Sequence, residues 1–247
     1  MAKQDERAFF NAAYKAEARQ GVWKYYDLMA KSRTYYDRFL LDESPGRRVL
    51  EYGCGVQSYA LRMARGGAEV VGIDIAEYAI ESSRSKARDE GLSNTSFHVM
   101  DAESMAFPDD DFDLICGTGI LHHLNLEKAL PELARVLRPA GQAVFLEPLG
   151  HNPAINAFRR RTPHLRTADE HPLVRRDFEL MKDHFDGIAV RYFTCLSLLA
   201  APLVRTRIFP PLLRALDRTD EIAFRVLPPL RYWSWYSAIS LSRPTVH

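Results

Sequence analysis

Short apolar stretches alternate with amphipathic segments along the first 148 residues. The apolar stretches predict β-strands at about 48–53, 68–74, 96–101, 112–117 and 142–148. The amphipathic segments predict helices from about Ser58, over 77–90 with Gly91 as a C-terminal cap, and over 126–138, where the Pro-Ala-Gly sequence at 139–141 marks the end. This alternation is typical of a mostly parallel sheet with helices on both faces. We therefore predict an α/β fold that binds its ligands at the carboxyl ends of the strands.

The segments on either side of this core, 46–148, have different patterns. Residues 1–45 are rich in aromatic side chains and predict helices that can cover a site as a lid. Residues 149–231 start as a polar, basic connection, predict a helix near 177–185 and a strand near 187–193, and become apolar and proline-punctuated from 194. That last stretch predicts a helical insertion before a terminal strand within 232–247, which completes a seven-stranded sheet in a single domain. The insertion can serve as extra core or a dimer face, as a lid over a hydrophobic pocket, or as a membrane-contact surface.

Composition and charge narrow the classes of partner. The chain is 47% hydrophobic and 26% charged, which suits one compact domain, and its net charge of +1 gives no general attraction to nucleic acid. Three cysteines without a CxxC pair and a polar N-terminus without a signal-peptide pattern indicate a reduced, cytoplasmic protein. The longest apolar run, around 194–204, is too short to cross a membrane, although peripheral contact with lipid is compatible with it. The oligomeric state stays open.

A glycine-containing turn follows the first predicted strand. Gly53 and Gly55 stand between a strand and a helix, where glycine lets the backbone approach a nucleotide closely. Asp74 ends the next strand and is placed to accept hydrogen bonds from both ribose hydroxyls. Glu51 distinguishes between cofactors, because a carboxylate repels a pyrophosphate and favours the ammonium and sulfonium groups of S-adenosylmethionine. Asp101 is suited to accept a hydrogen bond from the exocyclic amine of adenine, while the amide of Ala102 donates one to the ring.

In combination these motifs resemble the class I S-adenosylmethionine-dependent methyltransferases. The resemblance covers about residues 46–148 and is carried by VLEYGCG, VVGIDI, DAESMAFPDDDFDLICGTGILHHL and ELARVLRPAGQAVFLEP. It implies a Rossmann-like sheet, S-adenosylmethionine as methyl donor, and a cofactor contact from the Gly117 carbonyl. The cofactor-binding residues that follow are Glu51, Gly53, Cys54, Gly55, Gln57, Asp74, Ile75, Asp101, Ala102 and Gly117. Gln57 stands where the family usually has a third glycine, which leaves the shape of the loop open.

Catalytic residues are harder to identify, because methyl transfer needs a base only when the acceptor must lose a proton. His122 follows the fourth predicted strand and Glu147 ends the fifth, so both are expected at the edge where substrate meets the methyl group. Glu170, beside His171 in a proline-flanked segment, is a third candidate. Helix capping, packing or an exposed turn is the alternative role for each of them. No motif decides whether a metal is bound.

Basic and aromatic residues outside the core suggest the acceptor. We expect a small lipophilic or amphipathic molecule, such as a phenol or quinone precursor, with an anionic head group on arginine side chains. Candidate substrate-binding residues are Tyr26, His151, Asn152, Arg161 and Arg166. An alternative is carbon methylation of an isoprenoid diphosphate through a carbocation, with Glu170 as base and Mg²⁺ arriving with the diphosphate. Methylation of protein or RNA, and a cofactor-binding protein without methyl transfer, are further alternatives.

Overall fold

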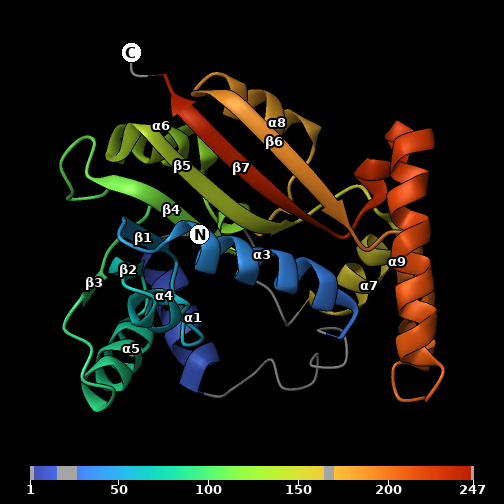
Figure 1. The fold of residues 1–247 in the computed structure, drawn as a ribbon, viewed down its shortest axis with the longest axis horizontal. Helices are drawn as coiled ribbons and strands as arrows, with labels where there is room; N and C mark the ends of the chain where they lie inside the picture. Colours follow the sequence, from blue (N-terminus) through green and yellow to red (C-terminus); the bar gives the residue numbers. More distant parts are fainter. Residues whose placement is uncertain (1–2, 16–26, 164–169, 246–247) are drawn as a thin grey trace.

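A seven-stranded sheet forms the centre of the molecule (Figure 1), a computed structural model that describes residues 3–15, 27–163 and 170–245. The strand order is β3-β2-β1-β4-β5-β7-β6. Neighbouring strands are parallel from β3 to β5, and β7 is antiparallel to both β5 and β6. The strands are β1 (Arg48–Tyr52), β2 (Glu69–Asp74), β3 (Thr95–Val99), β4 (Phe112–Thr118), β5 (Leu137–Pro148), β6 (Phe185–Phe193) and β7 (Tyr236–Pro244). The predicted Rossmann-like, mostly parallel sheet of seven strands is confirmed.

Helices cover both faces of the sheet because successive strand residues point to opposite sides. Val49 belongs to one buried cluster and Leu50 to the other, as the two-residue period of a strand requires. The Val49 face packs against α3 (Ala30–Glu43), α4 (Ala60–Arg65) and α5 (Glu77–Asp89). The Leu50 face packs against α6 (Leu126–Val136) and α8 (Arg175–Lys182). The sheet therefore separates two apolar cores.

The chain around Pro139 differs from the prediction. Helix α6 ends at Val136, and β5 begins at Leu137, which pairs with Phe112. The next paired residues are Leu114 and Gln142, so β5 accommodates the predicted turn as a bulge of four residues opposite one. Arg138 fixes this bulge by donating a hydrogen bond of 2.5 Å from Nη1 to Asp113 Oδ1.

Two helical segments frame the other side of the molecule. The polar, basic connection after β5, for which no helix was predicted from the sequence, contains α7 (Pro153–Arg161). The predicted insertion before the last strand is helical and comprises η5 (Leu196–Leu203), α9 (Phe209–Val226) and η6 (Pro228–Trp233). The terminal strand was predicted from residue 232 but begins at Tyr236, because η6 continues to Trp233. Within the described ranges, no helix has both the length and the apolar character to cross a membrane.

A buried carboxylate joins α9 to the start of η5. The Asp220 side chain, 3% exposed, accepts hydrogen bonds from the backbone amides of Cys195 (3.0 Å), Leu196 (2.7 Å) and Ser197 (3.2 Å). The Ser197 hydroxyl donates a fourth, at 2.9 Å. Since these amides lie at the first turn of η5, where a helix leaves amides without internal partners, Asp220 supplies the acceptors that the turn lacks.

We expect Asp220→Ala to lower the free energy of unfolding by about 2–4 kcal/mol, because it leaves several buried amides without an acceptor. Urea denaturation followed by circular dichroism measures the change. The matched control is Glu221→Ala, which removes partly exposed ion pairs with Lys31 at 2.9 Å and Arg191 at 4.0 Å and should cost less than about 1 kcal/mol. Equal effects of the two substitutions would contradict the anchoring role of Asp220.

Candidate functional site

The loop after β1 has the backbone shape that its two glycines allow. Gly53 and Gly55 have φ angles of +71° and +53°, in the left-handed region that favours glycine. A Cβ at Gly53 would lie 2.7 Å from Cδ1 of Ile120, so this position also has no room for a side chain. Gln57 does not have a positive φ, and α4 begins only at Ala60. The third glycine that the sequence lacks is therefore not needed by this loop.

Glu51 holds this loop against the start of α4. Its buried carboxylate accepts hydrogen bonds from the backbone amides of Tyr59 (2.6 Å) and Ala60 (3.1 Å) and from the Ser58 hydroxyl. Burial raises the pKa of the Glu51 carboxyl to about 7, and the hydrogen bonds oppose that rise. Besides contributing negative charge, Glu51 thus anchors the loop.

Asp74 joins the second strand end to the same loop. One carboxylate oxygen accepts from the Gly55 amide at 2.9 Å, and the other accepts from the Ala76 amide at 2.8 Å. Burial raises the pKa of Asp74, while these amides stabilise the charged form. Beyond β3, the Asp101 carboxylate accepts from the Glu103 amide at 3.0 Å, and the Ala102 carbonyl accepts from the Tyr52 hydroxyl at 2.5 Å. The ends of three adjacent strands therefore carry fixed polar groups at one edge of the sheet.

These groups line a cavity of about 850 Å³. Its volume lies in the range of small-molecule and cofactor pockets, about 300–1,000 Å³. Nine predicted cofactor residues line it: Glu51, Gly53, Cys54, Gly55, Gln57, Asp74, Ile75, Asp101 and Ala102. The tenth, Gly117, does not line it, and an added Cβ there would meet Cγ2 of Ile120 at 2.8 Å and the Tyr52 carbonyl oxygen at 2.9 Å. A cavity of this volume, lined by carboxylates and backbone amides, fits a nucleoside that carries a cationic amino-acid end.

Helix α1 (Lys3–Lys15) forms a further wall of the cavity. Lys3 lies 2.8 Å from a carboxylate oxygen of Glu103 and 3.4 Å from one of Asp101. The Asn11 side chain donates to Glu77 at 2.6 Å, at the start of α5. Phe10 and Tyr14 of the helix line the cavity, and Phe10 makes an edge contact with the His123 ring at 5.3 Å between ring centres. The N-terminal helix is thus held over the carboxyl edge of the sheet by polar contacts near both its ends.

Glu147 and His122 form a buried pair on the other side of the cavity. The Glu147 carboxylate is fully buried and accepts hydrogen bonds from the amides of Ile120 (2.8 Å) and Leu121 (2.9 Å). Its second oxygen lies 2.7 Å from Nδ1 of His122. Burial raises the pKa of the Glu147 carboxyl to about 7. His122 lines the cavity and Glu147 does not, so Glu147 can reach a ligand only through the imidazole.

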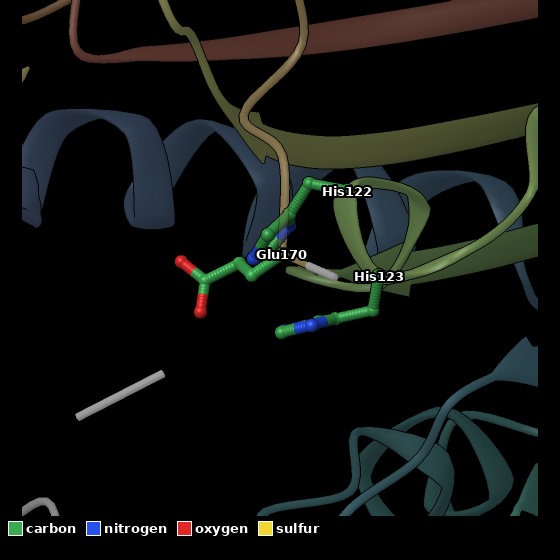
Figure 2. A group of neighbouring side chains, drawn as sticks. All are labelled: His122, His123 and Glu170. Atoms are coloured by element: carbon green, nitrogen blue, oxygen red, sulfur yellow. The ribbon is translucent and has the colours of Figure 1, made fainter. Parts of the chain in front are cut away.

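A third predicted catalytic residue, Glu170, lies beside the two histidines (Figure 2). One nitrogen of each ring and a carboxylate oxygen of Glu170 lie within 4.8 Å of one another. The Glu170 side chain is 8% exposed and forms an ion pair with Arg159, at 2.8 Å between Nη2 and Oε1. Together with Arg159, these side chains bring two imidazoles, a carboxylate and a guanidinium to one side of the cavity.

The predicted substrate residues are placed less favourably. The Asn152 side chain caps α7 by accepting from the amides of Ala154 and Ile155, and Nε2 of His151 accepts from the amide of Arg175. Neither residue lines the cavity, and Arg161 is exposed and does not line it either. Tyr26 and Arg166 lie outside the described residues, so their proposed roles stay predictions.

Helix α7 supplies the residues that the sequence interpretation missed. Ile155, Phe158 and Arg159 line the cavity, at the three- and four-residue spacings of one helix face. The sequence contains the signal for this helix, since Asn followed by Pro is a common start, with Asn as cap and Pro in the first turn. Counting from that start would have selected Arg159 instead of Arg161.

Comparisons with known proteins agree with this geometry. Residues 50–145 match a family model described as a methyltransferase domain. Over 115 residues the chain is 39% identical to methyltransferase GfsG of Streptomyces halstedii, covering 45% of this chain and 41% of that protein. Over 145 residues it is 34% identical to the ubiquinone/menaquinone biosynthesis C-methyltransferase UbiE of Yersinia enterocolitica, covering 53% of this chain and 58% of that protein. The chain thus spans between about two fifths and three fifths of these relatives.

A solved structure extends the likeness to the whole fold. The geranyl diphosphate C-methyltransferase of Streptomyces coelicolor, determined with Mg²⁺, geranyl diphosphate and S-adenosylhomocysteine, superposes with a TM-score of 0.62. The alignment covers 85% of this chain and 80% of that one, at 13% identity, which supports a shared fold. The family match, the named relatives and the sheet order lead to one conclusion. Residues 50–145 form a methyltransferase domain, set in a sheet with the Rossmann-like fold of the S-adenosylmethionine-dependent methyltransferases.

Proposed function

We propose that this protein transfers a methyl group from S-adenosylmethionine to a small amphipathic metabolite. One observation carries the proposal: a single cavity has the polar ends of β1, β2 and β3 on one side and His122, Glu170 and Arg159 on the other. A methyl donor and an acceptor have to meet within one enclosed space, because in-line transfer depends on their alignment.

The residues at the strand ends bind different parts of the cofactor. The sulfonium of S-adenosylmethionine supplies an activated methyl group when the cofactor is bound. Asp74 accepts from the ribose hydroxyls, and Asp101 with Ala102 binds the adenine. The amides and carboxylate of the loop from Glu51 to Gly55 hold the methionine end. The negative charge of Glu51 and Asp74 favours the cationic donor over its neutral product, which assists release after transfer.

On the acceptor side, His122 is the best-placed base. Its Nδ1 is engaged by Glu147 at 2.7 Å, an arrangement that fixes the ring and directs the other nitrogen away from that carboxylate. Glu147 acts as a positioning residue, since it does not line the cavity. An acceptor hydroxyl at His122 can then lose its proton as its oxygen attacks the methyl carbon.

The remaining lining residues suggest the kind of acceptor. Arg159 offers a guanidinium that binds carboxylate or phosphate oxygens with directed hydrogen bonds. Near it on the same helix are the apolar side chains of Ile155 and Phe158, and Trp235 lines the cavity as well. An acceptor with an anionic head and an apolar body, such as a phenol or quinone precursor, suits this combination.

A second candidate is carbon methylation of an isoprenoid diphosphate. It is favoured by the position of Glu170 in the cavity and by the fold shared with geranyl diphosphate C-methyltransferase. The alkene would attack the methyl carbon, and the Glu170 carboxylate would take a proton from the resulting cation. Aromatic side chains such as Phe158 and Trp235 would stabilise that positive charge, and Mg²⁺ would arrive with the diphosphate.

Incubation with methyl-labelled S-adenosylmethionine tests the proposal directly. Phenols, quinone precursors, aliphatic carboxylates and isoprenoid diphosphates form the acceptor panel, and mass spectrometry locates the transferred label. We expect label on an oxygen or carbon of an amphipathic acceptor. Tight binding of the cofactor without transfer to any acceptor would instead support a cofactor-binding protein that does not methylate.

Asp74→Ala should weaken the binding of S-adenosylhomocysteine by about 5- to 150-fold, which corresponds to about 1–3 kcal/mol for lost buried hydrogen bonds. Isothermal titration calorimetry measures the dissociation constant. The control is Glu69→Ala, which removes an acid from the other end of the same strand, where the side chain is 62% exposed. An unchanged dissociation constant in Asp74→Ala would exclude the ribose role.

Substitutions of His122, Glu147 and Glu170 distinguish between the two proposed classes of acceptor. If His122 is the base, His122→Ala and Glu147→Gln should lower kcat by about 100-fold or more, whereas the affinity for S-adenosylhomocysteine should stay unchanged. If the acceptor is an isoprenoid diphosphate, Glu170→Gln should instead cause the largest loss. Steady-state kinetics with the labelled cofactor measure these changes. Full activity in all three variants would contradict both assignments.

A further inference from the structure

Two histidines and a glutamate in the cavity have the composition of a metal site. A ligand atom from each of His122, His123 and Glu170 lies within 4.8 Å of the other two. Figure 2 shows the three side chains projecting from two neighbouring loops, the turn after β4 and the segment before α8. Ligands about 2.1 Å from one ion lie roughly 3–3.5 Å apart in tetrahedral or octahedral geometry. The three ligand atoms, within 4.8 Å of one another, are therefore near the separation that a single ion imposes.

The surroundings of His122 add an independent observation. A histidine that binds a metal through one nitrogen usually gives its other ring N–H to a carboxylate, which fixes the ring and makes it a better ligand. Glu147 occupies that position, at 2.7 Å from Nδ1, and is itself fixed by the amides of Ile120 and Leu121. With Nδ1 at Glu147, Nε2 is the ring nitrogen of His122 that lies away from that carboxylate.

We propose that His122, His123 and Glu170 bind a divalent transition-metal ion on the acceptor side of the cavity. Two imidazoles and one carboxylate favour Zn²⁺, Fe²⁺, Co²⁺ or Mn²⁺ over Mg²⁺, which prefers oxygen ligands and keeps much of its water. Three protein ligands leave further coordination positions open, and an open position is what distinguishes catalytic from structural sites. The position is therefore suited to coordinate a substrate atom.

The net charge of the ion and its neighbouring side chains then defines the class of substrate, provided that the proposed methyl transfer is correct. Arg159 lies 2.8 Å from Oε1 of Glu170, and a carboxylate has lone pairs enough to pair with a guanidinium and bind an ion at once. An ion of charge +2 together with Arg159 exceeds the charge of the single carboxylate that contacts them. The excess favours an acceptor that brings its own anionic oxygens, such as a phenolate, a catecholate or a diphosphate.

The ion would also change the role of His122. A coordinated hydroxyl loses its proton to solvent water more easily, because the positive ion stabilises the oxyanion. The oxygen could then use its electron pair to form the bond to the methyl carbon, while the carbon–sulfur pair stays on sulfur. In that state His122 holds the ion, and no side-chain base is required.

Cobalt provides a test that does not depend on activity. The full chain, freed of any purification tag and treated with a chelator, is titrated with Co²⁺ while its visible d–d absorption is recorded. We expect one Co²⁺ for each chain, with bands typical of nitrogen and oxygen ligands. His123→Ala and Glu170→Gln should abolish the bands, and Glu147→Gln should weaken binding by about 10- to 100-fold, the usual effect of removing a carboxylate partner of a ligand histidine. His98→Ala, an exposed histidine on β3, is the control.

The outcomes separate this proposal from the methyltransferase function. Affinity for S-adenosylhomocysteine, measured for each variant, verifies that the cofactor side is intact. Absence of the bands in the wild-type chain at millimolar Co²⁺, or bands that persist in both His123→Ala and Glu170→Gln, would overturn the metal site even if the enzyme methylates its acceptor. Conversely, bound Co²⁺ with the expected losses would support the site even if no acceptor in the panel is methylated.

Discussion

Buried carboxylates that accept hydrogen bonds from backbone amides determine the shape of this molecule around its cavity. Glu51, Asp74 and Glu147 each lie at the end of a strand, and each binds amides of a loop at the same edge of the sheet. Asp220 does the same for the first turn of η5. A buried charge is tolerated only when it is well paired, so each loop is restricted to conformations that satisfy its acid. The loops are consequently ordered by the strands that precede or adjoin them.

This arrangement also gives the cavity two chemically different sides. Glu51 and Asp74 lie beneath the glycine loop, whereas Arg159, paired with Glu170, lines the acceptor side with the two histidines. The proposed cationic donor and the proposed anionic acceptor would therefore be bound by different groups of residues. The division follows from topology, since the acids end β1 and β2 at the centre of the sheet and the arginine comes from a helix after β5.

Local patterns were sufficient to predict the sheet from the sequence, and nine of the ten residues predicted to bind the cofactor line one cavity. Each strand is a short apolar run, and the residues predicted to bind the cofactor stand at or just after the ends of those runs, so position along the chain gives position in space. The acceptor end combines distant segments. Arg159 and Glu170 meet across a connection whose helix was not recognised, and the anchoring by Asp220 depends on a contact between α9 and η5 that no local pattern encodes. At Pro139, pairing with β4 outweighed the turn propensity and produced a bulge.

The wall that α1 contributes differs in physical character from the walls built by the sheet. Lys3 reaches Asp101 and Glu103, and Arg7 reaches Glu77 at 3.3 Å, through partly exposed ion pairs. Ions in solution screen such pairs, whereas the packing of apolar strand residues is not weakened in that way. The two sides of the cavity therefore respond differently to ionic strength. As salt concentration rises, the ion pairs of α1 weaken, whereas the loops at the strand ends keep their shape. The rates at which ligands enter and leave the cavity therefore depend on salt, and the shape of those loops does not.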